Sequence, residues 1–241
     1  MFSQWDEDGI IAYLLDQLPP VPRTFVEFGV GDYRESNTRF LIRQGDWAGV
    51  IIEADPASCA RIRRLEEMWR YDLRLMEAFV TAESINELIG SAGCDGEIGV
   101  LSIDVDGNDY WIWKAISVVT PAIVVIEFNA RFGDERRVTI PYDPSFRRMT
   151  AHPSGIYFGA SLPAMVRLGQ ERGYDYVGSN TADINAFFVR SDLRPAHLPA
   201  LSAKEGFRPL RAREMRREGR LVFAAPEEES DVLRSLPLVE V

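Results

Sequence analysis

The sequence is short of several features, and each shortage narrows the classes of protein to which it can belong. Only two cysteines, Cys59 and Cys94, occur among the 241 residues, and their spacing is not that of a metal site. We therefore expect free, buried thiols in a reducing compartment. No stretch approaches the run of about 18 apolar residues that a membrane helix needs. Residues 1–10 carry acids where a secretory signal carries bases. A cytoplasmic protein without a membrane partner is the expectation.

Basic residues are outnumbered as well, with 27 Lys and Arg against 37 Asp and Glu, which gives a formal net charge of -10. An extended nucleic-acid surface needs a basic face, so a nucleic-acid partner is not expected. A small anionic ligand that is held locally stays compatible with this charge. The stretch from Arg208 to Arg220 is rich in arginine, but Glu214 and Glu218 interrupt it. This mixture favours a solvated helix face.

Short apolar runs alternate with helical patterns along most of the chain. Runs that are apolar on both faces are typical of parallel strands with helices on both sides of the sheet. Strands are predicted at 24–29, 48–53, 72–78, 100–104, 122–128, 174–178 and 186–190. Helices are predicted at 36–43, 56–69, 83–89, 109–116 and 161–172. This order predicts an α/β fold with a doubly wound, Rossmann-like, mostly parallel sheet and a late antiparallel strand pair.

Three segments decorate this core, and the length favours a single domain over residues 1–241. Apolar residues at helical spacing, followed by a proline pair, predict an N-terminal helix within residues 1–20. Residues 130–160 form an irregular insertion after a strand's carboxyl end, so we expect them to cover an acceptor site. Residues 191–241 form a charged C-terminal extension. Candidates for lining the acceptor site are Arg131, Tyr142, Tyr157 and Phe158.

Two glycines and two acids mark the ends of the first two predicted strands. Gly29 and Gly31 follow the first strand and allow a ligand to approach the backbone closely. Glu53 ends the second strand, one β-α-β step after Glu27, where a carboxylate can accept hydrogen bonds from a ribose diol. The dinucleotide pattern G-x-G-x-x-G needs a third glycine where this chain has Arg34, and a ligand without phosphate does not need it. A tight turn without a ligand, with Glu53 as a solvated acid, is the alternative.

Three segments carry a resemblance to a known family. EFGVGDYRESNT, IIEADP and LSIDVDGNDYWIW, in this order, resemble class I S-adenosylmethionine (SAM) dependent methyltransferases. The likeness is strongest to the FkbM-type group and related sugar and natural-product O-methyltransferases, and it covers about residues 20–130 and the late strand pair. It implies the adenine near strand three, the ribose on the second-strand acid and the amino group near the first. The SAM-binding residues that it implies are Glu27, Gly29, Gly31, Asn37, Glu53, Phe79, Val80 and Asp104.

Acids and an amide end the fourth and fifth predicted strands. Like charges that lie close together repel, so such a group usually has a cation or a function. The resemblance to metal-dependent members implies Asp104, Glu127 and Asn129 as ligands of Mg²⁺ or another divalent cation. In the alternative, Asp104 binds the amino group of SAM, Glu127 pairs with an arginine such as Arg131, and Asn129 caps a turn.

Three side chains are candidates for catalysis. Asp104 lies at the junction of SAM and acceptor, and Asp106 and His152 are candidate general bases. Catechol-type members carry a lysine base at the position of Gly107, so this chain departs from them. Asp109 is expected to cap the next helix.

The reaction expected from this set is methyl transfer from SAM to a hydroxyl of a sugar, polysaccharide or secondary metabolite. The expected partner is therefore a small-molecule or glycan acceptor, and a homo-oligomer is compatible with the sequence. Two other classes stay open. An NAD-dependent oxidoreductase would share the sheet and Glu53, but the missing third glycine counts against it. A non-catalytic methyltransferase-like binding module would keep the fold, but the acids after strands four and five count against it.

Overall fold

The structure, a computed structural model, describes residues 2–44, 46–211 and 213–241. Its centre is a seven-stranded sheet in the order β3-β2-β1-β4-β5-β8-β7. The strands are β1 (Thr24–Phe28), β2 (Ala48–Glu53), β3 (Leu73–Glu77), β4 (Gly96–Ile103), β5 (Val119–Glu127), β7 (Tyr174–Ser179) and β8 (Asn185–Arg190). The first five run parallel, whereas β8 is antiparallel to both of its neighbours. The predicted Rossmann-like sheet with a late antiparallel pair is confirmed.

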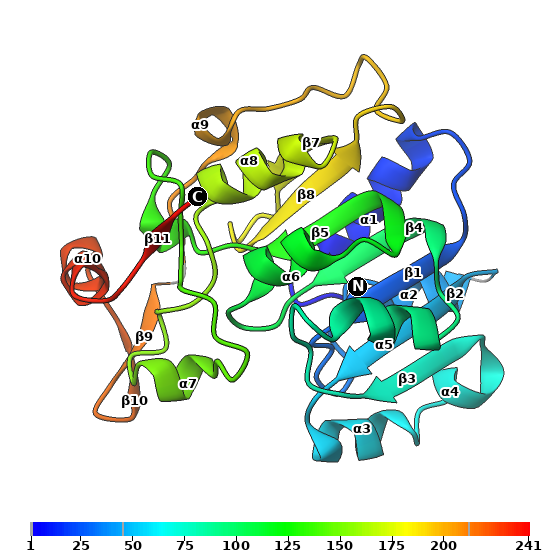
Figure 1. Ribbon diagram of the computed structural model, residues 1–241, viewed down its shortest axis with the longest axis horizontal. Coiled ribbons are helices and arrows are strands. Elements are labelled where there is room, and N and C mark those ends of the chain that lie inside the picture. The colour runs from blue at the N-terminus through cyan, green and yellow to red at the C-terminus, as the bar shows by residue number, and fades with distance from the viewer. Residues whose placement is uncertain (1, 45, 212) are drawn as a thin grey trace.

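Helices cover both faces of this sheet (Figure 1). One face carries α5 (Ile85–Ser91), α6 (Asp109–Ala115) and α8 (Leu162–Glu171), and the other carries α1 (Glu7–Gln17), α2 (Arg39–Gln44) and α3 (Pro56–Ile62). Successive residues of β1 point to opposite faces, so Phe25 packs into one core while Val26 and Phe28 pack into the other. This is why the predicted strands read as continuous apolar runs. Among the described residues, no helix is long and apolar enough to cross a membrane.

The helix predicted at 56–69 is interrupted, because α3 is followed by a turn and by the short α4 (Glu67–Arg70). After the break, Glu67 forms a buried ion pair with two arginines. The Glu67 carboxylate is almost fully buried and lies 2.7 Å from Arg39 Nη2 and 2.9 Å from Arg43 Nη1 of α2. The arginines hold the pKa of Glu67 below its ordinary value even though burial raises it. Helical periodicity does not report this long-range contact.

The predicted insertion packs beside the sheet against residues 214–240 of the C-terminal extension, whereas residues 203–206 pack against α8 and β7 (Figure 1). Their elements are η1 (Ala130–Phe132), β6 (Val138–Thr139), α7 (Arg148–Ala151), α9 (Ala203–Gly206), β9 (Glu214–Arg217), β10 (Arg220–Phe223), α10 (Pro226–Arg234) and β11 (Val239–Glu240). β11 pairs antiparallel with β6, and Arg131 forms a buried ion pair with Glu229 at 2.9 Å. The extension therefore holds the insertion in place.

The helix face expected between Arg208 and Arg220 is wrong. Residues 214–223 form the antiparallel hairpin β9–β10 instead. Its turn contains Glu218 with φ 51° and Gly219 with φ 77°, a left-handed backbone that ends any helix. The inner face of the hairpin buries Met215, which charge counting did not reveal.

Candidate functional site

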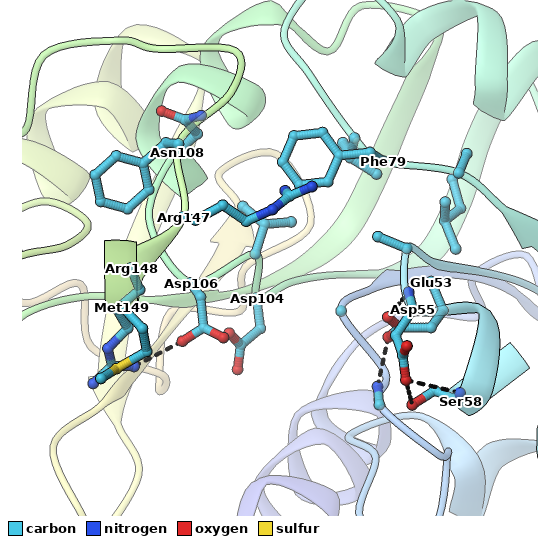
Figure 2. A pocket seen from close by; sticks show the side chains of 18 of the residues that line it. Glu53, Asp55, Ser58, Phe79, Asp104, Asp106, Asn108, Arg147, Arg148 and Met149 are labelled. Atoms are coloured by element: carbon cyan, nitrogen blue, oxygen red, sulfur yellow. Dashed lines mark hydrogen bonds and ion pairs between the residues drawn. The ribbon is translucent and has the colours of Figure 1, made fainter. Parts of the chain in front are cut away.

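A cavity of about 650 Å³ opens at the carboxyl ends of the parallel strands. Gly29 and Gly31 follow β1, Glu53 ends β2, and Asp104 follows β4 on its walls. Residues 146–150, at the start of α7, close the opposite side (Figure 2). Phe79 and Val80, placed near the adenine by the resemblance, also line it. This is where ligands bind in open α/β sheets.

A second cavity of about 460 Å³ lies on the other side of the glycine loop. It shares Gly29, Gly31 and Asp104 with the first cavity, and its own walls include Gln4 and Arg34. A ligand that passes over the glycines can therefore reach both cavities. Arg34, the position that breaks the dinucleotide pattern, lines this second cavity together with Glu35 and with Asp32, to which it is ion-paired at 3.7 Å.

Gly29 is needed because the chain passes very close to β4. Its φ is 70°, and a Cβ atom there would lie 1.6 Å from the carbonyl oxygen of Asp104. Gly31 has φ 55°, and its N–H donates to Glu53 Oε2 at 2.8 Å. The other oxygen of Glu53 accepts from the Asp55 N–H at 2.8 Å. Glu53 therefore fixes the glycine loop to the end of β2 while it lines the cavity.

Glu27 and Asn37 lie behind this loop and line neither cavity. The buried Glu27 carboxylate accepts from Ser36 Oγ at 2.6 Å, from the Asn37 N–H at 2.9 Å and from the Thr38 hydroxyl. Asn37 Nδ2 donates to Ser102 Oγ at 3.1 Å. Burial raises the pKa of Glu27, and these donors oppose the shift. The expected contact of both residues with SAM is therefore corrected to a role in holding the loop.

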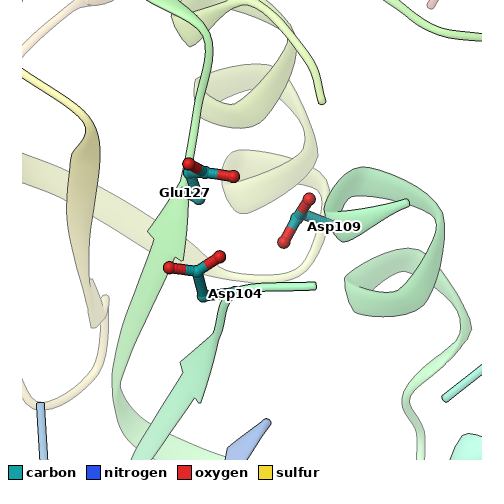
Figure 3. A group of neighbouring side chains, drawn as sticks. All are labelled: Asp104, Asp109 and Glu127. Atoms are coloured by element: carbon teal, nitrogen blue, oxygen red, sulfur yellow. The ribbon is translucent and has the colours of Figure 1, made fainter. Parts of the chain in front are cut away.

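Three acids, Asp104, Asp109 and Glu127, converge at the ends of β4 and β5 and form what we call the acid set (Figure 3). Each offers one oxygen within 4.8 Å of the others. Asp109 accepts from the N–H groups of Val105 and Gly107 at 2.8 and 2.9 Å, so the loop after β4 is folded around it. Glu127 Oε2 is buried and has no hydrogen-bond partner among the described residues. The acid set therefore has unused acceptor capacity.

Burial and mutual repulsion raise the pKa values of all three acids. Burial raises the pKa of Asp104 well above its ordinary value, and Asp106 and Asp109 raise it further. The pKa of Glu127 is raised well above its ordinary value by burial and then by Asp104. Burial raises the pKa of Asp109 to about 6. Such shifts are typical of groups that hold protons or cations.

The structure takes Asn129 out of the predicted metal-ligand set. Its Nδ2 donates to the carbonyls of Ile156 and Phe158 at 2.9 and 3.0 Å, and its Oδ1 accepts from the Arg131 N–H at 3.2 Å. It therefore caps η1 and anchors the insertion. Asp109, expected only as a helix cap, takes its place beside Asp104 and Glu127. Nothing in the spacing could reveal this exchange, because it depends on how the loop after β4 turns back.

Glu127 does not pair with Arg131, which was the alternative from the sequence. Arg131 is bound to Glu229, whereas Arg148 Nη1 lies 4.0 Å from Glu127 and 2.7 Å from Asp106. No pattern along the chain distinguishes Arg148 from the other arginines of the insertion.

The insertion does cover the cavity, but through residues 146–150 rather than the tyrosines. The hydroxyl of Tyr142 donates to Glu83, and that of Tyr157 donates to the carbonyl of Pro237 at 2.6 Å. Both tyrosines lie outside the cavity lining and hold the insertion in place.

Two further expectations concern His152 and Gly107, which lie close to this wall in the sequence. His152 is also absent from the cavity lining, and its Nδ1 is hydrogen-bonded to Ser154 Oγ at 2.7 Å, so the geometry does not support it as a base. A Cβ atom on Gly107 would lie 2.3 Å from the Phe146 ring. No lysine would fit at position 107 with this wall in place.

No family model matches the chain, and no curated protein matches it. Several solved structures are similar in backbone. A SAM-dependent methyltransferase from Clostridium acetobutylicum is 9% identical over 78% of this chain and 92% of its own, with a TM-score of 0.48. An O-methyltransferase from Bacillus cereus in complex with SAH is 15% identical over 76% and 78%, with a TM-score of 0.47. This chain spans only 62% of a methyltransferase from Galdieria sulphuraria, at 13% identity and a TM-score of 0.46. Similarity at this level says nothing about activity.

Proposed function

We propose that this protein is a SAM-dependent methyltransferase that acts on an acceptor hydroxyl of a sugar, polysaccharide or secondary metabolite. One observation carries the proposal. A single cavity joins the glycine loop and Glu53, which suit a nucleoside, to Asp104 of the acid set, which suits proton transfer. The resemblance of the three sequence segments supports SAM as the nucleoside, because SAM needs no third glycine.

The two cavities suit the two ends of SAM. Glu53 is positioned for the ribose hydroxyls, and Phe79 and Val80 for the adenine. The methionyl end would pass over Gly29 into the second cavity, where Arg34 is available to its carboxylate and the acids Asp32 and Glu35 to its ammonium group. SAM supplies the sulfonium-bound methyl group. The glycine loop positions it, and positioning is a large part of catalysis between two bound reactants.

The acid set suits the acceptor hydroxyl, which must lose a proton when its oxygen takes the methyl group. Asp104 lines both cavities, and its raised pKa makes its carboxylate a better proton acceptor than an ordinary one. Asp109 accepts hydrogen bonds from the N–H groups of Val105 and Gly107, so it fixes the loop that carries Asp104 and Asp106. In this proposal Asp104 takes the proton, while Glu127, which lines neither cavity and offers an oxygen within 4.8 Å of Asp104, places a second carboxylate beside it.

The first test is ligand binding. Calorimetric titration should show binding of SAM and S-adenosylhomocysteine, and none of NAD. Glu53→Ala should weaken SAM binding by about 1–3 kcal/mol, because it removes charge-assisted bonds and frees the glycine loop. The control is Glu77→Gln, since Glu77 is the partner of Glu53 on β3 but lies outside both cavities. Tight NAD binding without SAM binding would refute the proposed function.

The acid set also fits a divalent cation, and we include this in the proposal. Three acids with hard oxygen donors converge, and Glu127 Oε2 has no hydrogen-bond partner in the described part of the chain. A bound Mg²⁺ or Mn²⁺ would lower the pKa of the acceptor hydroxyl. EDTA should then abolish turnover while SAM binding changes little. Mg²⁺ should also raise the melting temperature of the wild type and not that of Glu127→Gln. Full turnover in excess chelator would show that the carboxylates act alone.

A further inference from the structure

Residues 2–6, which precede α1 and which we call the N-terminal segment, contribute to the wall of the second cavity. Most residues that line this cavity belong to the loop after β1, and Asp104 follows β4, whereas Gln4 comes from the N-terminal segment. The Gln4 side chain is exposed, and its amide forms no hydrogen bond with any described residue. This amide is therefore available to a ligand that enters the second cavity.

Hydrogen bonds fix both ends of the N-terminal segment. At one end, the carbonyl of Phe2 accepts from the N–H of Ser36, in the loop after β1, at 3.1 Å. At the other end, Asp6 accepts from the N–H and the hydroxyl of Thr181, in the turn between β7 and β8, both at 3.1 Å. The segment therefore crosses the edge of the sheet between two anchored points, and Gln4 lies between them.

The charges around the second cavity serve one end of the amino-acid group of SAM better than the other. Three acids, Asp32, Glu35 and Asp104, offer carboxylates to its ammonium group. Of the described residues that line the cavity, Arg34 is the one cation, and this exposed side chain lies 3.7 Å from Asp32. The carboxylate of SAM therefore needs a further donor. A glutamine amide supplies N–H donors and adds no charge that would repel the ammonium group.

We propose that the amide of Gln4 binds the methionyl carboxylate of SAM in the second cavity, so that the N-terminal segment completes the cofactor site. This inference rests on the proposed function and adds a binding residue from outside the strand ends. A hydrogen bond to a charged group changes affinity about tenfold or somewhat more. Because the segment is anchored on both sides of Gln4, its backbone needs no ordering when the ligand binds.

The test uses three ligands that share the adenosine group and differ in the amino-acid part. S-adenosylhomocysteine carries the carboxylate and the ammonium group, its decarboxylated analogue keeps only the ammonium group, and methylthioadenosine lacks both. In calorimetric titrations, Gln4→Ala should weaken S-adenosylhomocysteine binding about tenfold and leave the other two affinities unchanged. Gln4→Glu should weaken S-adenosylhomocysteine binding further, because two carboxylates repel each other, and should not weaken binding of the decarboxylated analogue.

The matched control is Gln170→Ala, which removes an exposed glutamine of α8 that lines neither cavity and should leave all three affinities unchanged. An unchanged affinity of Gln4→Ala for S-adenosylhomocysteine would overturn the inference. Equal weakening of all three ligands would also overturn it, because the N-terminal segment would then support the cavity without contacting the carboxylate. Absence of S-adenosylhomocysteine binding by the wild type would instead count against the proposed function itself.

Discussion

Replacing Gly29 with alanine is expected to abolish SAM binding and to lower the free energy of unfolding by about 3 kcal/mol or more. The added Cβ atom would lie 1.6 Å from the carbonyl oxygen of Asp104, which is backbone and cannot rotate away. β1 and β4 would have to separate where the two cavities meet. Denaturant unfolding and calorimetry with SAM measure the two effects on the same preparation.

Gly31→Ala is the matched control for this prediction. Gly31 has a similar left-handed backbone, with φ 55°, but a Cβ atom there meets nothing within 4 Å. It should cost only the conformational penalty of about 1–2 kcal/mol. If Gly29→Ala and Gly31→Ala proved equally mild, the close approach of the glycine loop to β4 would be wrong.

The second large effect concerns Glu127→Gln, which should stabilise the protein at pH 8 while it slows methyl transfer, because it removes a carboxylate beside Asp104. Glu127 is buried beside Asp104, and its pKa in the folded protein is raised well above the ordinary value of 4.5. The folded state therefore binds this proton more tightly than the unfolded state. Stability from this group is present at low pH and is lost as pH rises from the unfolded pKa through the folded one.

Glutamine carries no charge, so the variant avoids that loss. At pH 8 in EDTA, the free energy of unfolding should rise by an amount on the order of 1–3 kcal/mol. Each kcal/mol corresponds to an increase of about 2–4 °C in the melting temperature. Near pH 4 the two proteins should melt at nearly the same temperature. Glu87→Gln, on an exposed position of α5, is the control and should show no such pH dependence. A variant that is less stable than wild type at pH 8 would contradict the repulsion within the acid set.

The central sheet was predictable from the sequence because its strands are short, apolar on both faces and separated by helical patterns. β2 has the predicted bounds, and β5 begins three residues before the predicted start at 122. The hairpin β9–β10 was not predictable, since β9 is mostly charged and only Met215 is buried within the two strands. Periodicity reports burial against a large core, and these strands bury little.

The candidate site also contains residues that strand order predicts and contacts that it does not predict. Gly29, Gly31 and Glu53 follow strands directly, so strand order alone places them at the cavity. Glu27 was assigned to the ligand, but the loop after Gly31 folds back and supplies it with hydroxyl and N–H donors. Contacts that depend on the path of a loop are invisible to a pattern read along the chain. Asp109 entered the acid set in place of Asn129 for the same reason.

The pairing of β6 with β11 also bears on the order in which the protein takes shape. A ribosome releases residues in sequence, so every strand of the central sheet is available before residues 214–240 have been made. The wall that carries Arg147 and Arg148 leans on those late residues through Tyr157, which donates to Pro237, and through Arg131, which is paired with Glu229. The glycine-loop side of the cavity can therefore form on a nascent chain before the wall at residues 146–150 has its support.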